Sequence, residues 1–258
     1  MQALFEHRLE LSAHTTRALE LDGDGPGIVL LHGWGDSADT WRPLLLELAG
    51  RGRRAIAVDL PGFGEATRLG KGSLLGQLDA FATELVETWG DGRPVVVAGN
   101  SLGGCLALRL AERGELPLAG VVPVAPAGLE RPGWYDVVER DPLVRALLAA
   151  PMPVPLALVR ERPALPYPRA VVDAFAPPAA VTELLPELSV APFDLAGVDC
   201  PVLLVWGAHD RRLPDTGARI MLDLLPTTHV ALIEDCGRSP QLEATDRLLE
   251  LLLPFPAS

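Results

Sequence analysis

Apolar positions along this 258-residue chain fall into short continuous runs, separated by stretches with helical spacing. Strands buried on both faces of a parallel sheet have continuous rather than alternating apolar sequences, so six runs are predicted to be strands. These runs are residues 27–33, 54–62, 94–101, 118–126, 201–210 and 229–237. Two segments near the N-terminus, 7–12 and 16–21, alternate apolar with polar residues and predict a β-hairpin.

The stretches between these runs have the apolar spacing of amphipathic helices. They are residues 40–52, 73–90, 101–114, 216–226 and 239–253. The last helix is expected to begin at Ser239 as its N-cap, with Glu243 one turn further on. Strands that alternate with helices in this way predict an α/β fold with a doubly wound, mostly parallel sheet.

One region interrupts the alternation. Residues 126–192 contain 13 of the 25 prolines, which exclude long central strands and keep helices short. The region lies between two predicted core strands and carries apolar residues such as Trp134, Tyr167 and Phe175. We therefore expect a helical cap inserted over residues 127–197, with the core formed by residues 1–126 and 198–258. A disordered linker is the alternative.

Charge and composition argue against several classes of partner. A net charge of −12 argues against nucleic acid and anionic membranes as partners. No apolar run approaches the ~20 residues that span a bilayer, and the N-terminal segment lacks the basic and apolar regions of a signal peptide. Three cysteines without zinc-site spacing predict reduced thiols in a cytoplasmic protein with no metal and no cofactor. No oligomeric state follows from the sequence.

The segment GNSLGG, residues 99–104, follows a predicted strand and precedes a predicted helix. This is the context of a nucleophile elbow, whose tight turn presents a serine hydroxyl at the carboxyl edge of the sheet. Ser101 is therefore the predicted nucleophile. Side chains at Gly99 and Gly103 are expected to collide with the neighbouring strand and helix. A glycine-rich turn with an incidental serine is the alternative.

An oxyanion hole beside Ser101 requires two N–H donors. The expected donors are the backbone amides of Leu102 and of Trp34, which follows His32-Gly33. His32 and Asp59 are expected to fix loops through hydrogen bonds. Asp210 follows a core strand and is predicted to be the acid that orients a general base, with a surface turn as the alternative.

In chain order, HGWG (32–35), DLPGFGE (59–65), GNSLGG, GAHD (207–210) and CGRSPQLE (236–243) resemble the α/β-hydrolase family over nearly the whole chain. The resemblance is to small capped carboxylesterases, including carrier-protein methyl esterases, with carbon–carbon bond hydrolases as second relatives. It implies an α/β-hydrolase fold and a general-base histidine between Gly237 and Ser239. Arg238 stands at that position instead.

A guanidinium holds its proton with a pKa above ~12, so Arg238 cannot accept the proton of Ser101. His209 adjoins Asp210, but neighbouring loop residues usually point apart. We expect Arg238 to form a bidentate pair with Asp210 and to direct its other donors at Ser101.

The sequence thus predicts a serine esterase for a small, largely apolar ester or acyl ligand, with Ser101, Asp210 and Arg238 in its site and its turnover impaired. The alternatives are a non-hydrolytic binding protein, a lyase or cyclase that uses the same pocket, and an inactivated or engineered His-to-Arg variant of an esterase.

Overall fold

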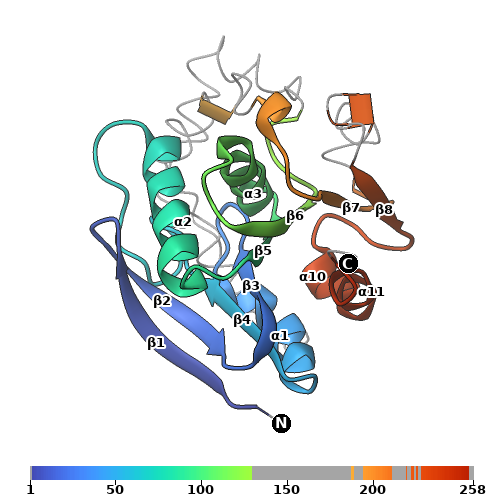
Figure 1. Cartoon of the computed structure of the whole chain (residues 1–258), viewed down its shortest axis with the longest axis horizontal. Coiled ribbons are helices and arrows are strands. Elements are labelled where there is room, and N and C mark those ends of the chain that lie inside the picture. Colours follow the sequence, from blue (N-terminus) through green and yellow to red (C-terminus); the bar gives the residue numbers. More distant parts are fainter. Residues whose placement is uncertain are drawn as a thin grey trace, which may run out of the picture.

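The computed structural model describes residues 2–129, 187–188, 194–210, 219, 222–223, 225 and 228–255. In this part of the chain one eight-stranded sheet has the order β1-β2-β4-β3-β5-β6-β7-β8 (Figure 1). The strands are β1 Leu4–Leu11, β2 His14–Leu21, β3 Asp24–Leu31, β4 Arg53–Val58, β5 Val95–Asn100, β6 Leu118–Val124, β7 Leu203–Gly207 and β8 His229–Ile233. The helices are η1 Ala38–Trp41, α1 Arg42–Ala49, α2 Leu74–Gly90, α3 Leu102–Arg113, η2 Leu195–Gly197, α10 Pro240–Glu243 and α11 Thr245–Leu252.

Strand pairing confirms the predicted α/β class. Strands β1 and β2 form the expected antiparallel hairpin, with Leu11 opposite His14, and β2 pairs antiparallel with β4. The strands from β4 through β3, β5, β6 and β7 to β8 all pair in parallel. The carboxyl ends of these six strands therefore share one edge of the sheet.

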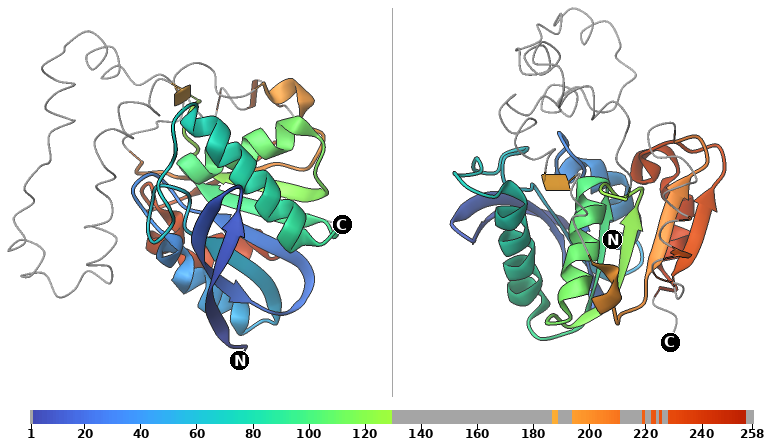
Figure 2. Two further views of the ribbon diagram at one scale, coloured as in Figure 1. Left: turned by 90° about the vertical axis from the view of Figure 1, so that its left-hand side faces the viewer. Right: turned by 90° about the horizontal axis from the view of Figure 1, so that it is seen from above.

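Two apolar cores lie on opposite faces of the sheet because successive strand residues point to opposite sides. In β3, Val29 and Leu31 join the core under α2 and α3, while Ile28 and Leu30 join the core under α1 and α11. Two views of the ribbon show these helix pairs on the two sides of the sheet (Figure 2). Both faces are thus covered, as the continuous apolar runs predicted.

The final predicted helix, residues 239–253, is two helices rather than one. Helices α10 and α11 are separated at Ala244, whose φ of −147° and ψ of 49° are not helical. Ser239 is the N-cap of α10, as predicted, but its side chain makes no capping hydrogen bond. Instead the carboxylate of Glu243 accepts the N–H of Ser239 at 2.9 Å.

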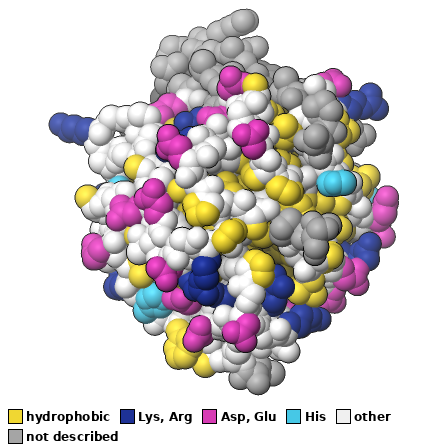
Figure 3. Space-filling view, in the orientation of Figure 1, with side chains coloured by type: hydrophobic (Ala, Val, Ile, Leu, Met, Phe, Trp, Pro, Cys, Tyr) yellow, Lys and Arg dark blue, Asp and Glu magenta, His cyan; other side chains and the backbone are white. Residues whose placement is uncertain are grey.

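Strand β8 also departs from the prediction, because it is not buried on both faces. It is the last strand of the sheet, and Val230 and Leu232 are 39% and 53% exposed. On the face shown in Figure 3, apolar side chains gather over the middle and right of the view. A continuous apolar run does not distinguish an edge strand from a central one.

The sheet is least continuous between β6 and β7. The ladder there has one register pair, Val124 with Val205, and an isolated bridge joins Val121 to Val202. Strands β5 and β6, by contrast, share six register pairs. Strands β7 and β8 are therefore joined to the rest of the sheet by few backbone contacts.

The predicted cap over residues 127–197 lies mostly outside the described residues, so the domain division stays a prediction. One described residue of this region, Glu187, contacts the start of α2. Its carboxylate accepts the N–H groups of Leu74 and Leu75, each at 2.9 Å, and the hydroxyl of Ser73 at 2.7 Å. An acidic group at a helix N-terminus is a favourable placement.

Within the described residues, no helix is long and apolar enough to cross a membrane.

A buried ion pair fixes the loop after β4. Asp59 is fully buried, and its carboxylate is bound by the Nε and Nη2 of Arg17 at 3.1 and 3.2 Å. The same carboxylate accepts the N–H groups of Ala38 and Glu65, each at 2.7 Å. The predicted loop-fixing role of Asp59 is thereby confirmed.

Asp59→Ala is expected to lower the free energy of unfolding by about 3 kcal/mol, because the buried Arg17 keeps its pair with Asp39 but not that with Asp59, and the amides of Ala38 and Glu65 lose their acceptor. Glu47→Ala, which removes an exposed pair with Arg51, should cost less than about 1 kcal/mol. Urea unfolding followed by tryptophan fluorescence measures both. Equal losses for the two variants would contradict this account of the ion pair.

Candidate functional site

Ser101 occupies a strained turn between β5 and α3. Its φ of 53° and ψ of −107° lie where residues with a side chain are rarely found. Backbone hydrogen bonds hold the residue on both sides, since Ser101 N donates to Val124 O and Ala127 N donates to Ser101 O, each at 2.9 Å. The surrounding structure therefore imposes this conformation.

Close backbone packing explains the two glycines of the elbow. A Cβ at Gly99 would lie 2.2 Å from the carbonyl oxygen of Gly103, and one at Gly103 would lie 2.1 Å from that of Leu31. Neither position can accept a side chain unless the backbone moves. The expected collisions are confirmed, and they bring β3, β5 and α3 together at Ser101.

The two predicted oxyanion donors border the serine. Leu102 follows it directly, and a Cβ at Gly33, which precedes Trp34, would lie 3.4 Å from the Cβ of Ser101. Among the described residues, neither the N–H of Trp34 nor that of Leu102 donates to a protein acceptor. Within the described part of the chain, both amides are therefore without a protein acceptor, and their role as oxyanion donors stays a prediction.

His32 fixes the loop that precedes Trp34. The ring is fully buried, with Nδ1 2.7 Å from the carbonyl oxygen of Gly33 and Nε2 accepting the N–H of Leu60 at 2.8 Å. The second contact makes Nε2 the acceptor, so Nδ1 carries the proton. Both nitrogens are occupied, which confirms the predicted loop-fixing role of this residue.

Arg238 brings the other predicted residues together. Its Nη2 donates to Ser101 Oγ at 2.6 Å, and its Nη1 lies 3.7 Å from Asp210 Oδ2. The side chain of Asp210 is only 1% exposed, so the surface-turn alternative is wrong. At 3.7 Å, the contact between Nη1 and Oδ2 is longer than the hydrogen bonds of the bidentate pair that we expected.

No histidine takes the place of the missing base. Among the described residues, which include all five histidines, the only side chain that binds Ser101 Oγ is Arg238. His209 is exposed, whereas the adjacent Asp210 is buried. The remaining rings lie elsewhere: His7 on Glu20, His14 on Thr67, His32 in its loop and His229 exposed at the start of β8.

The loops that carry Asp210 and Arg238 pack directly on each other. A Cβ at Gly207 would lie 2.0 Å from the carbonyl oxygen of Gly237, and His209 N donates to Cys236 O at 2.8 Å. Asn100 and Glu243 were not among the predicted site residues, yet both contact the backbone around Arg238. Their proximity to Ser101 and Ser239 in the sequence was the only available signal.

Other reactive groups nearby are not activated. The three cysteines are free thiols. Burial, followed by the charges of Glu243 and Asp210, raises the pKa of Cys236 to about 11, so this thiol is almost entirely protonated at neutral pH. In the described part of the chain, no group of three or more His, Cys, Asp or Glu residues could hold a metal ion.

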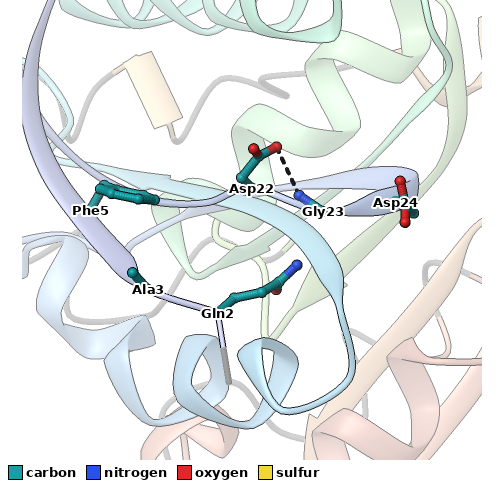
Figure 4. A pocket seen from close by; sticks show the side chains of 6 residues that line it. All are labelled: Gln2, Ala3, Phe5, Asp22, Gly23 and Asp24. Atoms are coloured by element: carbon teal, nitrogen blue, oxygen red, sulfur yellow. Dashed lines mark hydrogen bonds between the residues drawn. The ribbon is translucent and has the colours of Figure 1, made fainter.

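A separate hollow of about 280 Å³ lies at the opposite edge of the sheet. It is lined by Gln2, Ala3, Phe5, Asp22, Gly23 and Asp24 (Figure 4). Strands β3 and β5 are parallel, with Leu31 opposite Gly99, so Asp24 stands where the strands begin and Ser101 where they end. This hollow is therefore not part of the predicted site.

Comparison with known proteins identifies the family. The model of the α/β-hydrolase family matches residues 28–251, which is most of the chain. The chain belongs to the α/β-hydrolase family. This α/β-hydrolase is 31% identical over 243 residues to a pimeloyl-acyl-carrier-protein methyl ester esterase of Aromatoleum aromaticum, covering 84% of the chain and 92% of that protein. It is 28% identical over 249 residues to the same esterase of Nitrosomonas europaea, covering 90% and 96%.

A solved structure of a serine hydrolase involved in carbazole degradation is also similar to this α/β-hydrolase. It has a TM-score of 0.73 and 26% identity, with 98% of each chain covered. Together with the family match, this confirms the predicted fold and the resemblance to esterases.

The strain at Ser101 has a measurable consequence. Ser101→Gly should be more stable than Ser101→Ala by about 1 kcal/mol, because glycine relieves the positive φ while alanine retains it, and the entropic cost of glycine offsets only part of that gain. Both variants lose the hydroxyl, so the comparison isolates the backbone. Urea unfolding provides the measurement, and an alanine variant of equal or greater stability would show that the turn is unstrained.

Proposed function

We propose that this α/β-hydrolase is a serine esterase that binds a largely apolar ester or acyl compound with its carbonyl at Ser101, and whose turnover is strongly impaired by Arg238. The observation that carries the proposal is the 2.6 Å hydrogen bond from Arg238 Nη2 to Ser101 Oγ. It occupies the place where the family resemblance requires a proton acceptor.

The chemistry of that contact explains the impairment. Serine attacks a carbonyl effectively only when a neighbouring base removes its proton, and a guanidinium has no lone pair to offer. In this arrangement the hydroxyl accepts a hydrogen bond, which engages one of its own lone pairs. Loss of the base in a serine protease costs about 10⁶ in kcat, and the oxyanion hole and binding retain about 10³–10⁴ over the reaction in water.

The substrate class is supported by the relatives and by the aromatic residues near the serine. The two esterases described above are named for a methyl ester of an acyl chain. Beside the loop that borders Ser101, the rings of Trp34 and Phe63 pack edge to face with centroids 5.2 Å apart. An apolar acyl group fits such surroundings better than a charged one.

A second candidate is ligand binding without hydrolysis, or a lyase or cyclase reaction in the same pocket. The guanidinium and the amides of Trp34 and Leu102 are all donors near Ser101 Oγ, so they can hold a carbonyl or carboxylate oxygen without any acyl-enzyme. A third candidate is an esterase in which histidine has been replaced by arginine at position 238, by drift or by engineering.

Arg238→His is expected to raise kcat/KM for a short aryl ester by about 10³-fold or more, because an imidazole at this position can take the proton of Ser101. The gain should rise with pH through the imidazole pKa of about 6.5, above which the ring is neutral. Adding Ser101→Ala to this variant should abolish the gain. Arg247→His, at an exposed arginine of α11, is the matched control and should change nothing.

Two results would contradict the proposal. Ordinary Ser101-dependent turnover by the unaltered chain would show that Arg238 does not impair the site. A folded Arg238→His variant without any gain would exclude the silenced esterase and support the non-hydrolytic candidate.

A further inference from the structure

Asn100 joins the elbow to the loop that carries Arg238. This residue immediately precedes Ser101 and is buried, and its Nδ2 donates to the carbonyl oxygen of Arg238 at 2.9 Å and to that of Val124 at 3.3 Å. The side-chain amide of Asn100 therefore binds both residue 238 and the end of β6. Asn100 is also the residue bonded directly to Ser101.

Glu243 holds the same loop from the other side. Its Oε2 accepts the N–H of Gly237 at 2.8 Å, and its Oε1 accepts the N–H of Ser239 at 2.9 Å. These two amides flank Arg238, so one carboxylate fixes the peptide groups before and after it. All of these contacts involve the backbone of residues 237–239 rather than the guanidinium.

The packing leaves the loop little freedom to shift. A Cβ at Gly237 would lie 2.8 Å from Glu243 Oε2, and the carbonyl oxygen of Gly237 lies against Gly207 on β7. The loop is therefore confined between α10 and the end of β7. These contacts hold the loop through its backbone.

We propose that Asn100 and Glu243 are positioning residues that fix the backbone of residue 238, so that whichever side chain stands there is directed between Ser101 and Asp210. This inference rests on the proposed function for its catalytic consequence, but its structural content concerns the unaltered chain. It implies that a histidine at 238 needs no second substitution to reach both groups.

The size of each effect follows from burial. The hydrogen bond from Asn100 to the carbonyl oxygen of Arg238 is partly buried, whereas the hydrogen bonds of Glu243 are exposed to water, which can partly replace them. A shift of about 1 Å in a catalytic group costs about 10²-fold in rate. The Asn100 contact should therefore matter more than the Glu243 contact.

In the Arg238→His background, Asn100→Ala is expected to lower kcat for the aryl ester by about 30-fold, and Glu243→Gln by about fivefold, with KM within about threefold of its starting value. Glutamine keeps the shape of Glu243 but opposes one N–H with its own NH₂ group. Glu250→Gln, on the exposed face of α11 and paired with Arg247, is the matched control and should leave kcat unchanged. If Asn100 and Glu243 had a purely structural role, their variants would give less folded enzyme, and the kcat of the folded fraction would be unchanged.

A second measurement does not depend on turnover. In the chain with Arg238, crystal structures of Asn100→Ala and of Glu243→Gln should show the separation of Arg238 Nη2 and Ser101 Oγ increased beyond 2.6 Å. Because Glu243 lies on the surface, its variant provides the structure if Asn100→Ala does not fold. An unchanged separation in a folded variant overturns the positioning role, whatever Arg238→His does. If Arg238→His shows no turnover while the separation increases, the proposed function fails and the positioning role stands.

Discussion

The whole site depends on how closely three backbones approach each other at the elbow. The positions of Gly99 and Gly103 leave no space for a Cβ, because β3, β5 and the first turn of α3 meet there. This approach forces the chain to reverse within one residue, and Ser101 adopts a positive φ as a result. The carboxyl ends of β3, β7 and β8 then determine what surrounds the hydroxyl. Strain at one residue is tolerated because the packing of all its neighbours requires it.

Arg238 keeps the contacts that hold the site together, but its guanidinium cannot accept a proton. The guanidinium lies between a buried carboxylate and a hydroxyl, so the charge of Asp210 is balanced and the loop around residue 238 keeps its hydrogen bonds. A buried charge without a partner usually destabilises a protein. With arginine at position 238, the buried charge of Asp210 has such a partner. Under the proposed function, the fold would keep the arrangement of a serine hydrolase without the group that removes a proton.

Much of this architecture could be read from local patterns. Apolar runs located the six parallel strands, and the sequence GNSLGG between a strand and a helix located the turn at Ser101. The exposed face of β8 could not be predicted, because its apolar run matches those of the central strands. The break at Ala244 has no sequence signal, since alanine favours helices. The contact of Asn100 with Arg238 joins residues 138 positions apart, and the role of Glu243 depends on a loop whose path only tertiary packing determines.

The short ladder between β6 and β7 has a consequence for the local opening of the molecule. Ser101 belongs to the larger half of the sheet, which ends at β6, while Asp210 and Arg238 follow the two strands beyond it. Local opening begins where few backbone bonds must break, and here that line runs between the hydroxyl and the guanidinium. A transient parting of the two halves would release Ser101 from its cationic neighbour while each half stays folded. The contact between Arg238 and Ser101 thus spans the part of the sheet that has the fewest register pairs.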